Sequence, residues 1–296
     1  MFEGFETVEV AAADGRVLRG CAGGDRDAPP LLLLHGYPQT HVMWHAVAPD
    51  LAQTHRVILL DLPGYGASDA PPPTGDHAPY SKGAWAARLT AAMGKLGYER
   101  FALAGHDRGA RAAYRLALDF PDRVTRLALL DIVPTISMWE MAGARFCIDT
   151  FHWGFLAQPA PFPEKMIEGD PDRFLDYCIA RWAAPGFVFD AAAHAAYREA
   201  HRRPQVIAAT CEDYRAGATV DVAADRATRE AGVTYDGPSL VIWGAHNFGR
   251  DTDAICSLWR GFLKTPQGLA LDCGHFVAEE KPAETARALS AFLAAG

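Results

Sequence analysis

The 296-residue sequence contains no Gly-x-Ser-x-Gly motif. In esterases and lipases this motif places the serine nucleophile between a strand and a helix. This absence argues against both classes. No stretch reaches the roughly 18 consecutive apolar residues of a membrane span. The segment Met1–Val10 carries acidic residues and lacks the apolar stretch of a signal peptide. We therefore expect a cytoplasmic protein with no membrane partner.

The sequence also lacks closely spaced cysteines and an excess of positive charge. Its six cysteines are scattered without a Cys-x-x-Cys pair, so we expect reduced thiols rather than a disulfide framework or a metal site. With a net charge of −8, the chain has no general attraction for nucleic acids or anionic membranes. An anionic substrate would need local cations to overcome this field.

Short apolar runs recur along the chain, each about four residues long and followed by a polar residue or glycine. Such runs are typical of strands buried on both faces of a parallel sheet. Amphipathic segments at 81–96 and 108–120 supply helices between them, and residues 5–10 with 17–21 form a predicted hairpin. The pattern predicts an α/β protein with a doubly wound, mostly parallel sheet. The runs are residues 31–34, 57–60, 101–104, 127–130, 240–243 and 269–271.

The composition changes between about residues 134 and 237. This segment is rich in aromatic residues, arginine and alanine, with helical spacing and no buried-strand runs. It is too long for a plain loop. We predict a helical cap at residues 135–236, inserted into an α/β core formed by residues 1–134 and 237–296.

The segment Gly105-His106-Asp107-Arg108-Gly109 follows one of the predicted strands and precedes a predicted helix. A nucleophile flanked by small residues at this place is the nucleophile elbow of α/β hydrolases. A carboxylate with an ordinary pKa of about 3.9 is already ionised at neutral pH, and it can attack saturated carbon to form an ester. Asp107 could instead be a plain helix N-cap, since aspartate is common there. Its place after a buried strand favours the nucleophile.

An ester intermediate needs a base that activates water, and His275 in Gly274-His275-Phe276 stands where an α/β hydrolase carries its histidine, last in chain order. Asp131, at the end of the run 127–130, is the predicted carboxylate partner that orients this histidine. The competing place after the run 240–243 offers no acid before Asp251. A turn or capping role is the alternative for Asp131.

The segment His35-Gly36-Tyr37-Pro38 follows the first predicted buried strand. An HGxP loop in this position can present the backbone N–H of Tyr37, with that of Arg108, as an oxyanion hole. It would stabilise the tetrahedral stage of ester hydrolysis. The motif marks a superfamily rather than a substrate.

Taken together, these residues resemble the fluoroacetate (haloacetate) dehalogenases of the α/β-hydrolase superfamily. The resemblance spans nearly the whole chain and implies the α/β-hydrolase fold with an inserted helical cap, release of fluoride and glycolate from fluoroacetate, and often a homodimer. The segments that carry it are His35-Gly36-Tyr37-Pro38, Gly64-Tyr65-Gly66, residues 105–111, residues 130–135, Phe151-His152-Trp153, Asp213-Tyr214-Arg215-Ala216 and Gly274-His275-Phe276.

The resemblance also implies two binding sets. It assigns Arg108 and Arg111 to the substrate carboxylate, and His152, Trp153 and Tyr214 to the departing halide. The chemistry agrees, because two guanidinium groups three residues apart on a helix share a face and suit a small carboxylate. The three aromatic side chains are N–H and O–H donors that could stabilise a poor leaving group. Taken singly, each residue could instead be a surface arginine or a packed aromatic.

Other functions share parts of this pattern. Epoxide hydrolases have the aspartate elbow, the HGxP loop and the late histidine, but they use two cap tyrosines; Tyr214 could be one, whereas His152 stands where the other is expected. A haloalkane dehalogenase has no use for two arginines. A catalytically silent small-molecule receptor could keep the triad. We expect no metal or organic cofactor, because nucleophile, base and donors are all side chains.

Overall fold

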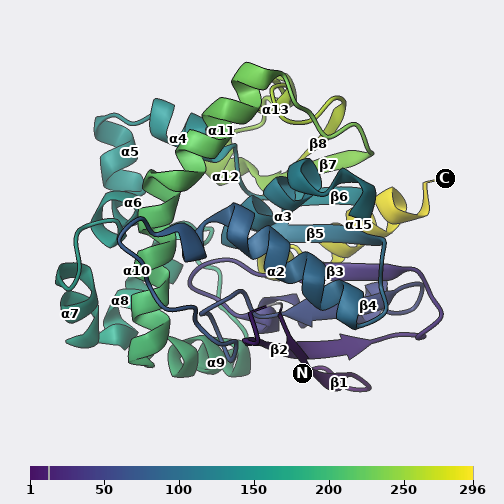
Figure 1. The fold of residues 1–296 in the computed structure, drawn as a ribbon, viewed down its shortest axis with the longest axis horizontal. Helices are drawn as coiled ribbons and strands as arrows, with labels where there is room; N and C mark the ends of the chain where they lie inside the picture. Colours follow the sequence, from purple (N-terminus) through teal and green to yellow (C-terminus); the bar gives the residue numbers. More distant parts are fainter. Residues whose placement is uncertain (13, 296) are drawn as a thin grey trace.

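The computed structural model describes residues 1–12 and 14–295, which contain one eight-stranded sheet (Figure 1). The strand order is β1-β2-β4-β3-β5-β6-β7-β8. The pairs β1–β2 and β2–β4 are antiparallel, and the remaining pairs are parallel. The strands are β1 Glu6–Ala11, β2 Val17–Gly23, β3 Pro30–Leu34, β4 Arg56–Leu60, β5 Phe101–His106, β6 Val124–Leu130, β7 Ser239–Gly244 and β8 Pro266–Leu271. The sheet confirms the predicted α/β fold and N-terminal hairpin.

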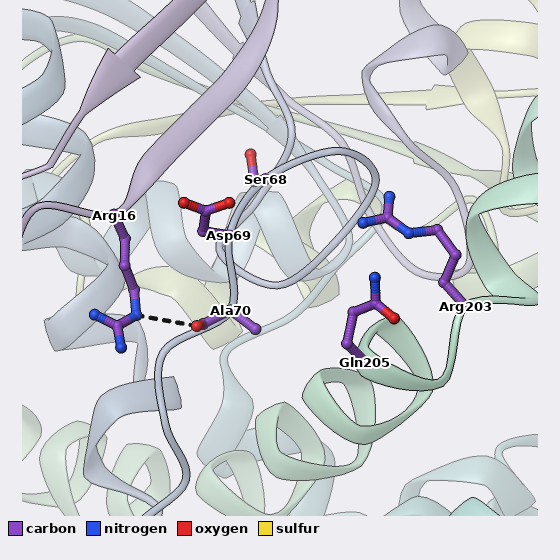
Figure 2. Close-up of a pocket in the computed structure, with 6 residues that line it drawn as sticks. All are labelled: Arg16, Ser68, Asp69, Ala70, Arg203 and Gln205. Carbon is purple, nitrogen blue, oxygen red and sulfur yellow. Dashed lines mark hydrogen bonds between the residues drawn. The ribbon is translucent and has the colours of Figure 1, made fainter.

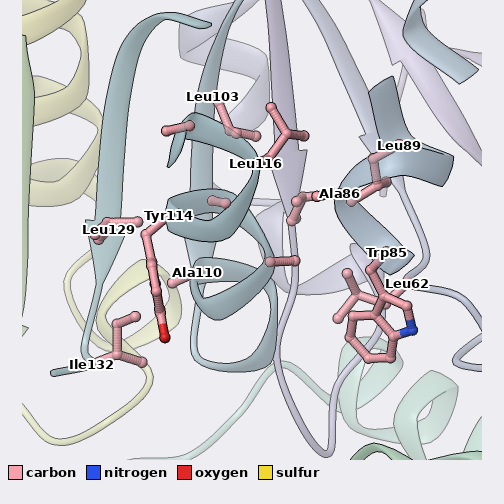
Figure 3. Packing of buried hydrophobic residues seen from close by; sticks show 14 of the residues in the cluster. Leu62, Trp85, Ala86, Leu89, Leu103, Ala110, Tyr114, Leu116, Leu129 and Ile132 are labelled. Atoms are coloured by element: carbon pink, nitrogen blue, oxygen red, sulfur yellow. The ribbon is translucent and has the colours of Figure 1, made fainter. Parts of the chain in front are cut away.

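The central strands are apolar throughout because both faces of the sheet are covered. In β3, Leu32 and Leu34 face one hydrophobic core while Leu31 and Leu33 face the other, and all four are fully buried. Figure 3 shows the first core, where residues of α2 and α3 such as Trp85 pack against strand residues. A strand covered on one face would alternate apolar and polar residues instead.

Helices on the two faces come from the segments between strands. The helices α2, α3 and α13 contribute to the first core, and α1, α14 and α15 contribute to the second. The predicted helices at 81–96 and 108–120 correspond to α2 and α3. These elements are η1 His41–Trp44, α1 Ala48–Leu51, η2 Ala78–Tyr80, α2 Lys82–Lys95, α3 Arg108–Asp119, η3 Pro121–Arg123, α12 Ala245–Phe248, α13 Thr252–Trp259, α14 Val277–Glu280 and α15 Pro282–Ala294.

Between β6 and β7 the chain forms a run of helices, and α5 to α10 lie together beside the sheet, at the left of Figure 1. The run is α4 Thr135–Glu140, α5 Ala144–Asp149, α6 Phe151–Leu156, α7 Phe162–Glu168, α8 Pro171–Trp182, α9 Ala191–His201, α10 Pro204–Ala218 and α11 Val220–Ala231. This is the segment for which we propose a cap at 135–236; its boundaries as a folding unit stay a prediction. Across residues 1–12 and 14–295, no helix is long and apolar enough to span a bilayer.

Candidate active site

Asp107 lies on a sharp turn between β5 and α3. Its backbone has φ +45° and ψ −114°, a conformation that L-residues rarely adopt and that stores about 1–3 kcal/mol of strain. Asp107 occupies the N-cap position of α3, but its side chain makes no capping hydrogen bond. Glycine is needed nearby: a Cβ on Gly109 would lie 2.3 Å from the His35 carbonyl oxygen, and one on Gly36 would lie 2.5 Å from the Asp107 Cβ. The elbow therefore presents the carboxylate rather than using it as a cap.

The two oxygens of the Asp107 carboxylate differ in their surroundings. The backbone N–H of Tyr37 donates to Oδ1 at 2.9 Å, and no described residue donates a hydrogen bond to Oδ2. Burial raises the pKa of Asp107, but the charges of His275 and Arg108 outweigh burial and hold the pKa below its usual value. The carboxylate is thus ionised with one oxygen free. Of the two N–H groups predicted for an oxyanion hole, that of Tyr37 contacts the carboxylate, whereas that of Arg108 makes no such contact among the described residues.

His275 is paired with Asp131. The ring Nδ1 of His275 lies 2.5 Å from Oδ2 of Asp131, and no described residue bonds Nε2. An Nδ1–H donated to the carboxylate leaves Nε2 with its lone pair, as a base requires. Burial lowers the pKa of His275, but the hydrogen bond and the charge of Asp131 outweigh burial, so the pKa lies above its usual value. Asp131 is itself held by the Gly244 N–H at 2.8 Å and by the Asn247 amide at 2.7 Å.

Further contacts hold the loop of His275, and no sequence pattern indicated them. The Glu280 carboxylate accepts from the N–H groups of Gly274 at 2.8 Å and Phe276 at 2.9 Å, on both sides of the histidine. The backbone N–H of His275 donates to the Trp182 carbonyl oxygen at 2.9 Å. The ring of His106 hydrogen-bonds the His275 carbonyl oxygen at 2.9 Å. Core and cap segments together therefore fix the position of the histidine.

A cavity of about 840 Å³ connects these groups with the helices between β6 and β7. It brings together all the predicted site residues except Arg108, which does not line it in the part of the chain that the structure describes. Its inner wall carries charged and hydrogen-bonding groups, and methionine and phenylalanine side chains from α4, α5 and α12 line another part. The predicted residues that line the cavity are Tyr37, Asp107, Arg111, Asp131, His152, Trp153, Tyr214 and His275.

The two predicted carboxylate-binding arginines are placed differently. Arg111 lines the cavity, and its Nη1 donates to the Val133 carbonyl oxygen at 3.1 Å and to the Thr135 hydroxyl at 3.0 Å. Arg108 is fully buried, with its guanidinium 4.2 Å from the Tyr214 ring centre and clamped by Asp213. Arg111 therefore offers its charge to the cavity directly, whereas most donors of Arg108 are already occupied.

The predicted halide-binding side chains meet at the cavity wall. His152 and Trp153 lie on α6, and Tyr214 lies on α10. The ring centre of Tyr214 lies 5.5 Å from that of His152 and 6.1 Å from that of Trp153. Among the described residues, no hydrogen-bond partner satisfies the Tyr214 hydroxyl, the Trp153 N–H or the buried Nδ1 of His152. Burial lowers the pKa of His152 to about 3, so the ring is neutral and keeps one N–H. The arrangement can offer three donors to a small anion.

Trp182 is a cavity residue that sequence reasoning missed. Its ring centre lies 4.3 Å from that of His152 and 6.0 Å from that of His275. Its ring therefore packs beside both the predicted halide site and the predicted base. One tryptophan among many cap aromatics carries no signal in the sequence that would single it out.

A second cavity, of about 450 Å³, lies beside the N-terminal end of α10 (Figure 2). Arg16 donates from Nε to the Ala70 carbonyl oxygen at 3.0 Å, and Arg203 hydrogen-bonds the Gly66 carbonyl oxygen. It contains none of the predicted site residues and no activated nucleophile. The large cavity is thus the candidate active site.

Comparisons with known proteins identify the family of the chain. The chain matches the α/β-hydrolase fold family over residues 29–282. It is 42% identical to a fluoroacetate dehalogenase of Burkholderia sp over 99% of this chain and 95% of that one, and 31% identical to a soluble epoxide hydrolase of Corynebacterium sp. (strain C12) over 86% of each. An α/β hydrolase structure from Nostoc sp PCC 7120 superposes with a TM-score of 0.95 at 43% identity, covering 100% of both chains. The chain therefore belongs to the α/β-hydrolase family, in the group that contains fluoroacetate dehalogenase.

Proposed function

We propose that this protein is a haloacetate dehalogenase that converts fluoroacetate to glycolate and fluoride. One observation carries the proposal: a single cavity wall holds an ionised Asp107, the charged Arg111 and the unpartnered donors of His152, Trp153 and Tyr214. A nucleophile for carbon, a cation for a carboxylate and donors for a leaving anion are the three groups that this reaction needs. The identity to a fluoroacetate dehalogenase supports the same assignment.

In the first step, the substrate carboxylate binds Arg111, with Arg108 behind it. Oδ2 of Asp107 attacks the α-carbon, and the electron pair of the carbon–halogen bond leaves with the halide. Halide departure is the difficult part, since fluoride is a poor leaving group. Donors placed where the charge develops stabilise the transition state more than the ground state. His152, Trp153 and Tyr214 take this role.

In the second step, Nε2 of His275 removes a proton from water, and the resulting hydroxide adds to the carbonyl carbon of the Asp107 ester. The negative charge develops on Oδ1, which already accepts the Tyr37 N–H at 2.9 Å. Collapse of the tetrahedral intermediate breaks the bond between the carbonyl carbon and Oδ2, and Oδ2 leaves as the hydroxyl oxygen of glycolate with the proton from the His275 imidazolium. The new Asp107 carboxyl group then loses its proton to water, which regenerates the carboxylate. Asp131 holds the ring and stabilises the imidazolium.

An epoxide hydrolase is the second candidate, favoured by the 31% identity to a soluble epoxide hydrolase. Tyr214 could donate to an epoxide oxygen. Two observations weigh against it: a buried arginine charge lines the cavity, which a neutral epoxide does not need, and a neutral imidazole at His152 stands opposite Tyr214 in place of a second phenol.

Halide release measured with ion-selective electrodes tests the proposal, using fluoroacetate, chloroacetate and 2-chloropropionate, with styrene oxide hydrolysis run in parallel. We expect fluoride and glycolate in equal amounts. Chloride release without fluoride would keep Asp107 and Arg111 but reject the fluoride site. Diol formation without any halide would overturn the proposal in favour of an epoxide hydrolase. An Asp107→Ala protein that released halide at the wild-type rate would exclude this nucleophile.

A further inference from the structure

Arg108 is held from behind by one carboxylate on the cap helix α10. Its Nε donates to Oδ2 of Asp213 at 2.8 Å, and its Nη2 donates to Oδ1 at 2.5 Å and to the Asp213 carbonyl oxygen at 3.1 Å. Nη1 is buried and has no partner in the described part of the chain. Gly217, one turn later, leaves room for the guanidinium, since a Cβ there would lie 3.1 Å from Nη2. Nη1, with its two N–H groups, is therefore the one guanidinium nitrogen of Arg108 without a partner among the described residues.

Lys82 occupies the other side of the same carboxylate. Its Nζ hydrogen-bonds Oδ1 of Asp213 and lies 3.4 Å from Oδ2 of Asp221, and the Tyr65 hydroxyl donates to Oδ2 of Asp213 at 2.7 Å. Lys82 and Asp213 are almost fully buried. Asp213 thus accepts from Arg108, Lys82 and Tyr65 together, and its charge is shared between two cations.

A buried lysine is expensive to desolvate, and Arg108 alone would be enough to pair with Asp213. An isolated Arg108–Asp213 pair would present little net charge to an anion. A second cation on the Asp213 carboxylate makes the electrostatic potential in the cavity more positive. With Lys82 present, two cations share Asp213, and the second carboxylate, that of Asp221, pairs with Lys82 rather than with Arg108, so part of the Arg108 charge stays uncompensated. Asp213 also precedes Tyr214 on α10, so the same turn of helix sets both the guanidinium and the phenol.

We propose that Asp213 and Lys82 are positioning residues for anion recognition: Asp213 fixes Arg108 with only Nη1 free, and Lys82 offsets the Asp213 charge so that the buried cluster still attracts a carboxylate. The inference rests on the proposed haloacetate dehalogenase function. It also implies that Arg111 makes the main contact with the substrate carboxylate, whereas Arg108, which does not line the cavity, acts mainly through its electrostatic field.

The proposal predicts a split between KM and kcat. The substrate carboxylate keeps its charge from ground state to transition state, so a remote cation stabilises both equally. Loss of such uniform binding raises KM and leaves kcat nearly unchanged. A merely structural defect would instead lower kcat and the thermal stability together.

The test uses the full chain with chloroacetate and fluoroacetate turnover, and calorimetric binding of acetate as a readout without chemistry. For Lys82→Met we expect KM and the acetate Kd to rise at least about fivefold, with kcat within about twofold of wild type. For Asp213→Asn we expect both to rise about tenfold, because Arg108 loses its two-oxygen clamp. The double variant has the same net charge as wild type. Any rise in its KM and acetate Kd therefore measures the loss of the Asp213 clamp on Arg108 alone. Lys95→Met, on the exposed end of the same helix, is the matched control.

The outcomes separate the inference from the proposed function. If the folded Lys82→Met and Asp213→Asn proteins bind acetate as wild type does, the inference is overturned while the dehalogenase assignment stands. Tighter acetate binding by Asp213→Asn would also overturn it, since Asp213 would then only oppose the anion. If Lys82→Met does not fold, Lys82→Gln keeps a polar contact to Asp213 and is expected to show the same weaker binding. A wild-type protein that releases no halide overturns the proposed function, and acetate binding still decides the inference.

Discussion

Nδ1 of His275 and Oδ2 of Asp131 lie 2.5 Å apart, although 144 positions separate the two residues in the chain. Asp131 follows β6 and His275 follows β8, and both strands run parallel to β7 between them. Asp131 takes φ +53° there, held by Gly244 and Asn247. The parallel sheet thus brings a carboxylate and a base to one edge, and the charge of the first tunes the second.

An Asp131→Asn substitution tests this pairing. His275 must be neutral to take a proton from water, and its pKa is raised, so wild-type activity falls as the pH decreases through a value above 6.5. The asparagine removes the carboxylate that raises this pKa, so the acidic limb should move to lower pH. Because the ring also loses its orienting partner, kcat should fall by a factor on the order of 10³.

The pH profile of kcat, measured by halide release, distinguishes these effects. The exposed Asp122→Asn serves as the control and should retain the wild-type profile. An unshifted acidic limb in Asp131→Asn would assign the pH dependence to a group other than His275.

A His275→Gln substitution should separate the two steps. Asp107 needs no base, so alkylation and the first halide release should survive, whereas ester hydrolysis should stop. We expect one halide per protein and then no further turnover, with the ester on Asp107 detected by mass spectrometry. The control His246→Gln, an exposed residue at the cavity, should keep turning over. Steady turnover by His275→Gln at the wild-type rate would reject His275 as the base.

The sheet and the triad could be predicted because their signals are local in the sequence. Each buried strand is a short apolar run, and strands of a parallel sheet share one carboxyl edge, so Asp107, Asp131 and His275 had to meet there. The family resemblance assigned Arg111 to the substrate carboxylate, and its place one turn of helix after the nucleophile agrees with that assignment.

The remainder of the site depends on how the helices between β6 and β7 pack, which no local pattern specifies. Asp213 was visible only as the neighbour of Tyr214, and nothing in the sequence indicated that it would clamp Arg108 rather than lie in solvent. Lys82 stands directly after the helix cap Ser81, where a lysine is usually exposed. Trp182 meets His275 only through the tertiary fold, and Glu280, although close in the sequence, shows no pattern that marks it as the acceptor of the N–H groups on both sides of His275. Long-range electrostatic contacts of this kind required the structure.

Arg111→Lys is expected to raise the KM for fluoroacetate about 10- to 100-fold. Lysine keeps the charge, but it loses the planar fork that fits a carboxylate and the bonds to Val133 and Thr135, a change worth about 1.5–3 kcal/mol. Arg115→Lys, one turn further along α3 and paired with Asp119 at the surface, is the matched control and should leave KM unchanged. Equal KM values for the two variants would remove Arg111 from the carboxylate site.

Tyr214→Phe should impair defluorination more than dechlorination. The hydroxyl has no partner in the described residues, and burial raises the pKa of Tyr214 well above its usual value, so the group is a free donor. Because charge is more concentrated on fluoride than on chloride, we expect a loss on the order of 10²-fold with fluoroacetate and a smaller one with chloroacetate. Rates on both substrates give the comparison. Tyr235→Phe, whose hydroxyl bonds the Val124 carbonyl oxygen in the core, is the control. Equal losses on both substrates would argue against halide contact by Tyr214.

Glu279 should make the protein less stable as the pH rises. Its carboxyl accepts from Tyr197 of α9 at 3.0 Å and from Gln39, and burial raises its pKa from 4.5 to about 8, although both hydrogen bonds lower it. Between these two values the folded state holds a proton that the unfolded state has lost. The stability present below pH 4.5 is therefore lost progressively up to about pH 8, by as much as about 1.4 kcal/mol per pH unit.

Glu279→Gln removes the titrating proton but keeps a donor and an acceptor. The variant should gain stability relative to wild type at pH 8 and little at pH 5, as measured by urea unfolding at both values. The exposed Glu230→Gln, treated in the same way, should follow the wild-type curve. A parallel loss of stability in Glu279→Gln and wild type from pH 5 to 8 would contradict the prediction. The Glu279 carboxyl would then be ionised in the folded protein, and Tyr197 of α9 and Gln39 would donate to a charged carboxylate.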